Sequence, residues 1–126
     1  MEKVGEHITL DIVGTKKEYT PEFYEKLVYK IAKAAKVTVL KISKYKFEPQ
    51  GFTLVALLAE SHISFHTFPE KEIVSFDFFT CGKVSPKVSL DIIKDEMEHT
   101  NIITVSYTHL RAHETGRNLV CRLLLE

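Results

Sequence analysis

The sequence predicts an α+β fold, a two-layer sandwich in which two helices cover one face of a mostly antiparallel sheet. Short segments of alternating or β-branched apolar residues recur along the chain, separated by turn signals. Only two segments carry apolar residues at helical spacing, and each begins at a Thr-Pro or Ser-Pro pair. The predicted order is therefore β-α-β-β-β-β-α-β, with the helices segregated to one face of the sheet.

The first three elements follow from local pattern. Residues 7–14, HITLDIVG, alternate apolar and polar side chains and end at a glycine, which predicts a strand. Thr20 has the character of an N-cap and Pro21 that of a first helical residue, so a helix is expected over 21–35. Residues 37–47 are β-branched and alternating, and the turn PQG follows them.

Three more strands are expected in the middle of the chain. Residues 52–59 are almost continuously apolar, as in a central strand that is covered on both faces or covered by a partner subunit. Residues 62–68 alternate up to Pro69, and residues 73–79 alternate again.

The second helix is predicted to begin at Ser85 as N-cap with Pro86 in the first turn. Its apolar stripe consists of Val88, Ile92, Ile93 and Met97. Residues 101–105 are β-branched and would form the last strand.

Composition restricts the class of protein. The chain has 126 residues, enough for one domain, and its 17 basic and 17 acidic side chains balance. This balance gives no electrostatic footprint for a nucleic acid or an anionic membrane. No apolar run is long enough to span a bilayer, and the N-terminus lacks a signal-peptide core, so a cytoplasmic protein is expected. Two cysteines do not make a disulfide framework.

Reactive side chains gather in the stretch LLAESHISFHTFPE, residues 57–70. Ser61 lies where two strand-like segments meet, a place where a strained peptide would suit local chemistry. By alternation His62 and His66 share one face of the strand, with Ser61 opposite unless a break rotates it. Cys81, in FFTCG, follows another strand and precedes a glycine.

Four interpretations of these residues compete. His62, His66 and Cys81 could bind a metal, but histidines four apart on a strand are ~13 Å apart. A Cys-His hydrolase has the residue types without a recognisable nucleophile context. The polar residues could simply face solvent, with Cys81 as a small buried side chain. Finally, the Ser61 hydroxyl could attack the preceding carbonyl, and elimination would leave an N-terminal pyruvoyl group that can replace pyridoxal phosphate.

The blocks GEHITLDIVG, PQG, LLAESHISFHTFPE and DFFTCG, in this order and spacing, resemble the short prokaryotic S-adenosylmethionine decarboxylase proenzymes over residues 4–104. The resemblance implies self-cleavage between Glu60 and Ser61. The products would be a β chain of residues 1–60 and an α chain that begins with the pyruvoyl group. No metal and no pyridoxal phosphate are implied.

The resemblance also implies roles for single residues. Ser61 is the precursor of the pyruvoyl group, which forms the Schiff base with substrate. His66 transfers protons during processing and Thr53 supports that step. Cys81 is the proton donor that protonates the substrate carbon after CO2 leaves. Phe47, Phe68 and Glu70 are candidates for binding the adenine, the sulfonium or the ribose of S-adenosylmethionine.

The function implied is the conversion of S-adenosylmethionine to its decarboxylated form for spermidine biosynthesis, by a homodimer in which both protomers can contribute to each site. Phe68 stands where the family usually has Trp, which leaves a pyruvoyl-dependent ornithine or arginine decarboxylase open. A third alternative is a paralogue that does not process and serves as a regulatory partner. The retention of Ser61, His66 and Cys81 argues against it.

The last residues have no clean period, and they resemble the translated read-through of a sequencing adapter. Two constant parts of such an adapter, with an index gap between them, would encode residues 105–115 and 119–125. We therefore predict a native domain over 1–104, a non-native tail over 105–126, and a missing authentic C-terminus. His109, His113 and Cys121 are accordingly left out of any site.

Overall fold

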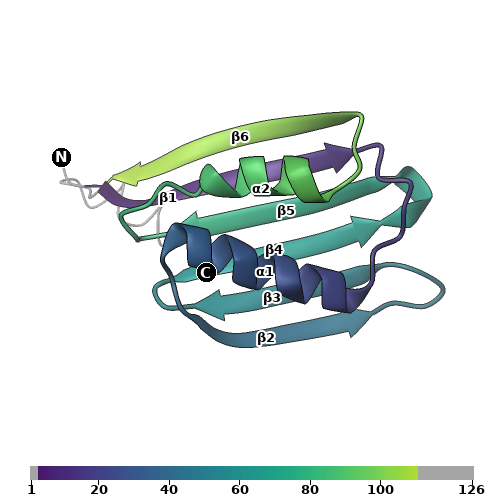
Figure 1. Cartoon of the computed structure of the whole chain (residues 1–126), viewed down its shortest axis with the longest axis horizontal. Coiled ribbons are helices and arrows are strands. Elements are labelled where there is room, and N and C mark those ends of the chain that lie inside the picture. Colours follow the sequence, from purple (N-terminus) through teal and green to yellow (C-terminus); the bar gives the residue numbers. More distant parts are fainter. Residues whose placement is uncertain (1–2, 111–126) are drawn as a thin grey trace, which may run out of the picture.

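A computed structural model describes residues 3–110, and it shows one sheet with two helices on the same face (Figure 1). The two-layer α+β sandwich and the predicted element order are thereby confirmed. The elements in chain order are β1 (Lys3–Val13), α1 (Pro21–Ala35), β2 (Val39–Lys46), β3 (Phe52–Leu58), β4 (Ser61–Phe68), the 3₁₀ turn η1 (Pro69–Lys71), β5 (Ile73–Thr80), α2 (Val88–Glu96) and β6 (Asn101–Leu110).

The six strands pair in the order β2-β3-β4-β5-β1-β6, and every neighbouring pair is antiparallel. The sheet is thus wholly antiparallel. Strands β2 to β5 follow each other as hairpins, because short turns join them. β1 lies between β5 and β6, so the N-terminal strand is in the interior of the sheet and β6 is an edge strand.

Helix α1 begins and ends where the sequence predicts. The Thr20 hydroxyl accepts a hydrogen bond from the Phe23 backbone N–H at 3.1 Å, and Pro21 occupies the first turn. Lys36 adopts a left-handed conformation with φ 59°, which ends the helix. The buried face of α1 covers the β2–β3–β4 side of the sheet and consists of Tyr24, Leu27, Val28, Ile31, Ala32 and Ala35.

Helix α2 begins two residues later than predicted. The Ser85 hydroxyl accepts a hydrogen bond from the Lys87 N–H at 3.3 Å, and the Ser85 carbonyl accepts one from the Val88 N–H. These bonds close a tight turn ahead of the helix, so Ser85 caps that turn and Pro86 lies within it. The regular helix then starts at Val88.

The helices cover only one face of the sheet. Along β3, Leu54 and Ala56 are fully buried beneath the helices, whereas Val55 and Leu57 on the other side are 43% and 53% exposed. The apolar run 52–59 is therefore covered on one face within the chain, and its second face is available to a partner. We call the side of the sheet away from α1 and α2 the open face.

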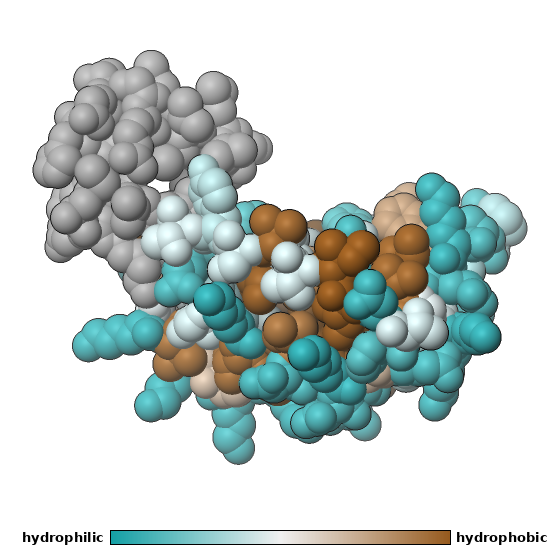
Figure 2. Space-filling view, turned by 90° about the horizontal axis from the view of Figure 1, so that it is seen from above, coloured by the Kyte–Doolittle hydropathy of each residue, from teal (hydrophilic) through white to brown (hydrophobic). Residues whose placement is uncertain are grey.

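Strand β6 continues to Leu110, beyond the predicted end at residue 105. It pairs with β1 from Asn101 to Leu110. Backbone hydrogen bonds make this pairing, and they do not depend on an alternation of apolar and polar side chains, so the sequence pattern did not predict the longer strand. Seen from above (Figure 2), hydrophobic side chains gather on the side where β6 is the edge.

Neither described helix is long and apolar enough to cross a membrane. The origin of residues 105–126 stays a prediction, and 111–126 lie outside the described residues.

Candidate active site

The predicted cleavage point lies in a two-residue turn between β3 and β4. Leu58 pairs with Ser61 across this hairpin, so Ala59 and Glu60 alone reverse the chain. Glu60 has φ 59°, in the left-handed region that costs a residue with a side chain roughly 1–2 kcal/mol. The break predicted near Glu60 and Ser61 is confirmed, and its backbone strain lies next to the peptide bond that the sequence marks for cleavage.

Ser61 is held in place by the neighbouring strand. The side chain is on the helix-covered face with only 7% exposure, opposite Thr80 in the β4–β5 pairing. Its hydroxyl donates a hydrogen bond to Thr80 Oγ1 at 3.0 Å, and the Gly82 N–H donates to the same oxygen at 2.9 Å. Thr80 is not among the site residues predicted from the sequence, although it lies within the FTCG block. Its position opposite Ser61 in the strand register is the signal that identifies it.

Cys81 follows β5 at the same end of the sheet and is exposed. Partial removal from water raises the pKa of the thiol, and the negative charge of Glu60 raises it further. The thiol therefore keeps its proton at neutral pH, which is what a proton donor requires. Glu60, Ser61, Thr80 and Cys81 thus form one group, which we call the junction group.

The other predicted site residues lie at the opposite end of β4. Thr53 Oγ1 and His66 Nδ1 are hydrogen-bonded at 3.0 Å, directly across the β3–β4 pairing. They line a cavity of about 370 Å³. We call it the open-face cavity, and its lining residues are Phe47, Gln50, Gly51, Thr53, His66, Thr67, Phe68 and Glu70. All five predicted residues outside the junction group therefore meet in one cavity.

Within one chain these two groups are separate. Ser61 and His66 are five residues apart on the same strand, which at about 3.3 Å per residue is about 16 Å. They also point to opposite faces, because residues an odd number apart alternate across a strand. Proton transfer needs a contact of about 3 Å, so His66 does not reach Ser61 of its own chain.

A further polar cluster lies on the open face around Asp77. His7 Nε2 and His62 Nε2 lie 2.7 Å and 3.1 Å from Asp77 Oδ2, and the Ser64 hydroxyl donates to Oδ1. Burial by itself raises the pKa of Asp77, but the hydrogen bonds from His62, His7 and Ser64 together hold it well below its usual range. His7 and Asp77 are not among the residues predicted from the sequence, because they come from different strands, β1 and β5.

The same cluster bears on metal binding. Among the described residues, His7, His62 and Asp77 have ligand atoms within 4.8 Å of one another and could hold a divalent cation. Hydrogen bonds already satisfy these atoms. The set His62, His66 and Cys81 is not brought together, because His62 bonds to Asp77 while His66 bonds to Thr53.

Comparison with known proteins identifies the family of the chain. A family model described as S-adenosylmethionine decarboxylase matches residues 6–109. A protein of Brevibacillus brevis named S-adenosylmethionine decarboxylase proenzyme is 32% identical over 123 residues, 92% of each chain. One of the same name from Methanococcus vannielii is 40% identical over 98 residues, covering 75% of this chain and 80% of its own.

A solved structure of the same family has the same fold as this chain. The crystal structure of the adenosylmethionine decarboxylase from Aquifex aeolicus matches with a TM-score of 0.78 and 31% identity, covering 90% of this chain and 97% of that one. The chain therefore belongs to the S-adenosylmethionine decarboxylase family, and the resemblance found in its motifs is confirmed.

Proposed function

We propose that the chain is the proenzyme of a pyruvoyl-dependent S-adenosylmethionine decarboxylase that cleaves itself between Glu60 and Ser61. The observation that carries this proposal is the junction group. A strained turn, an oriented hydroxyl and a protonated thiol occur together at one end of the sheet. The family of the chain supports the same reaction and substrate.

The processing step uses only groups of the chain and one water. Ser61 Oγ attacks the Glu60 carbonyl carbon, the C–N bond breaks, and an ester replaces the amide while nitrogen gains a proton. Loss of the Ser61 α-proton then expels the Glu60 carboxylate and leaves a dehydroalanine. Its tautomer, an imine, takes up water and releases ammonia, which leaves the pyruvoyl carbonyl. Thr80 orients the attacking hydroxyl.

The residues around Ser61 fit such a group. A pyruvoyl group derived from Ser61 would supply an electrophilic carbonyl for the substrate amine and a sink for the electrons left when CO2 departs. Cys81 is the next reactive group at this end of the sheet, and its raised pKa keeps the proton on sulfur. In the proposed reaction the thiol delivers that proton to the substrate α-carbon.

A second copy of the chain completes the site. Because His66 lies about 16 Å along β4 from Ser61 of its own chain, we propose that His66 and Thr53 act on the Glu60–Ser61 turn of the partner, which lies at the end of the sheet. The open face is the surface for this homodimer. It exposes apolar side chains that the two copies would cover, namely Tyr45, Val55, Leu57, Phe68 and Ile103.

The open-face cavity would then hold the nucleoside end of the substrate. Phe47 and Phe68 are 46% and 41% exposed and can stack on adenine or on the cationic sulfonium. Glu70 accepts a hydrogen bond from Gln50 at 3.2 Å, which leaves its carboxylate able to accept from ribose hydroxyls. The product in this proposal is the aminopropyl donor for spermidine synthesis.

Intact-mass analysis of the purified protein tests the processing. We expect two chains that divide at residues 60 and 61, with a blocked N-terminus on the second. Ser61→Ala stays uncut, whereas the control Ser64→Ala on the opposite face still cleaves. A wild-type chain that stays whole under native conditions refutes the proposal. Release of CO2 from S-adenosylmethionine, ornithine and arginine, measured side by side, tests the substrate.

Mixed dimers test the partner contribution. Expressed alone, Ser61→Ala and His66→Ala chains should each fail to cleave. In a mixed dimer of the two, the His66→Ala chain supplies an intact Ser61 and the Ser61→Ala chain supplies an intact His66. We expect only the His66→Ala chain to be cleaved. If neither chain is cleaved although mixed dimers form, His66 does not act across the interface.

A further inference from the structure

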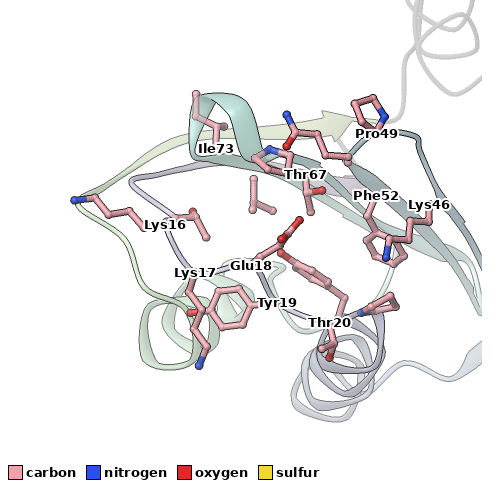
Figure 3. A pocket seen from close by; sticks show the side chains of 17 residues that line it. Lys16, Lys17, Glu18, Tyr19, Thr20, Lys46, Pro49, Phe52, Thr67 and Ile73 are labelled. Atoms are coloured by element: carbon pink, nitrogen blue, oxygen red, sulfur yellow. The ribbon is translucent and has the colours of Figure 1, made fainter.

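A second, larger cavity lies on the helix-covered side of the sheet, at the end away from the junction group. Its volume is about 460 Å³, within the usual range for small-molecule sites. The loop between β1 and α1, the first turn of α1 and the β2–β3 turn enclose it (Figure 3). None of the residues proposed above for processing or decarboxylation lines it. We call it the helix-side cavity.

The floor of the helix-side cavity is apolar, with one buried hydroxyl. Tyr24 is 2% exposed, and its ring packs on Phe52 and Phe65 with centroids 5.6 Å and 5.1 Å away. Within residues 3–110, no hydrogen bond joins the Tyr24 hydroxyl to another side chain or to the backbone. Burial raises the pKa of this phenol well above its usual range, and Tyr19 and Glu18 raise it further. The hydroxyl therefore stays a neutral donor without an acceptor, which is costly in a buried place.

Two opposite charges face the cavity without meeting. Figure 3 shows the Glu18 carboxylate and the Lys46 ammonium pointing into it from different sides, whereas Lys16 and Lys17 point outward. In the described part of the chain, neither Glu18 nor Lys46 has an ion pair. Three lysines and one carboxylate line the cavity, and both Glu18 and Lys46 are exposed at its mouth. An inward-pointing anion and an inward-pointing cation beside an apolar floor are complementary to a ligand that carries both charges on an apolar body.

We propose that the helix-side cavity binds a small zwitterion of the amino-acid class with an apolar side chain. Its ammonium lies on Glu18, its carboxylate accepts from Lys46 and the Tyr24 hydroxyl, and its side chain packs on Phe52 and Val74. A plain anion leaves Glu18 unpaired, and a plain amine leaves Lys46 unpaired. The chemistry of the lining therefore favours a ligand with both groups.

This site adds to the proposed function and does not depend on it. The helix-side cavity shares Gln50, Gly51 and Thr67 with the open-face cavity. His66 and Phe68 adjoin Thr67 on β4, so a ligand here touches the strand that carries two residues of the proposed substrate site.

Calorimetric titration with three probes of one shape tests the proposal. L-Leucine carries both charges, L-leucinamide lacks the carboxylate, and 4-methylpentanoic acid lacks the amine. We expect L-leucine to bind with a Kd of about 1 mM and the other two at least about tenfold more weakly. The titration uses the wild-type chain and the uncut Ser61→Ala chain, so failure of processing and failure of this site are distinguished.

Variants assign the contacts. Glu18→Gln should weaken the binding of L-leucine at least about fivefold and leave the binding of 4-methylpentanoic acid unchanged. Lys46→Gln should also weaken the binding of L-leucine at least about fivefold, and it should leave the binding of L-leucinamide unchanged. Lys41→Gln, on the same strand as Lys46, and Asp95→Asn on α2 are controls, and thermal unfolding confirms that each variant folds. Absence of binding by L-leucine overturns the proposal. So does equal binding of the three probes, or an equal loss in the controls.

Discussion

Replacement of Asp77 by Asn should destabilise the fold, because this carboxylate holds three side chains from two neighbouring strands. Hydrogen bonds to a charged group contribute about 1 kcal/mol more than neutral ones. Three such bonds would give about 3 kcal/mol. The side chains of Asp77, His7 and His62 are 24%, 30% and 38% exposed, so solvent weakens the effect. We expect a loss of about 2 kcal/mol in the free energy of unfolding, or about 8 °C in Tm.

The pH dependence follows from the direction of the pKa shift. The pKa of Asp77 is lower in the folded protein than in the unfolded chain, where it is about 3.9. Its stabilisation is therefore fully present above pH ~5 and is lost as pH falls through 3.9 toward the folded value. The difference between the parent and Asp77→Asn should be present at pH 7 and shrink below pH ~4.

Urea unfolding in the uncut Ser61→Ala background, at fixed protein concentration, measures this difference on a single covalent chain. Asp11→Asn is the matched control, since the exposed Asp11 carboxylate accepts one hydrogen bond from Ser75 at 3.0 Å. The control should change stability by no more than about 0.5 kcal/mol. Equal stability of Asp77→Asn and its parent at pH 7, or a difference that persists unchanged at pH 3.5, would refute the reasoning.

Three further outcomes are expected. Thr80→Val should slow self-cleavage at least about tenfold, whereas Thr80→Ser should retain it, because only a side chain with a hydroxyl can accept the hydrogen bond from Ser61. Gel analysis over time measures the cleavage rates, and equal rates for the two variants would contradict the role of Thr80. In the uncut background Glu60→Gln should lower the pKa of Cys81 and so speed its alkylation at pH 8, and an unchanged rate would remove Glu60 as a cause. Leu54→Ala should cost about 2–5 kcal/mol in urea unfolding, because Leu54 is fully buried; a loss below about 1 kcal/mol would show that the core closes around the cavity.

Most of the fold could be predicted from local pattern. The limits of α1 follow from Thr20, Pro21 and the apolar spacing, and the hairpin strands follow from alternation between turn signals. The start of α2 could not be placed, since Ser85 and Pro86 can cap either a helix or a preceding turn. Pairing of β1 between β5 and β6 is a long-range contact that no local pattern reports.

The candidate site could also be predicted only in part. Ser61, Cys81 and His66 could be proposed as site residues because the motifs that contain them resemble those of a known family. Their separation into a junction group and an open-face cavity could not, because it depends on which face each side chain takes and on the length of β4. Thr80 and Asp77 were missed because their importance arises only from the strand register that sets them beside Ser61 and His62.

Strand order also decides what a cut between Glu60 and Ser61 does to the molecule. Residues 1–60 contribute β1, β2 and β3, and the remainder contributes β4, β5 and β6. In the order β2-β3-β4-β5-β1-β6 the two fragments alternate, so three of the five ladders join one fragment to the other. The severed fragments are thus interleaved within one sheet, and they cannot part without unfolding. Reassembly from separated fragments would be a bimolecular reaction, so the cut form, once unfolded, would recover more slowly at low concentration than the uncut chain.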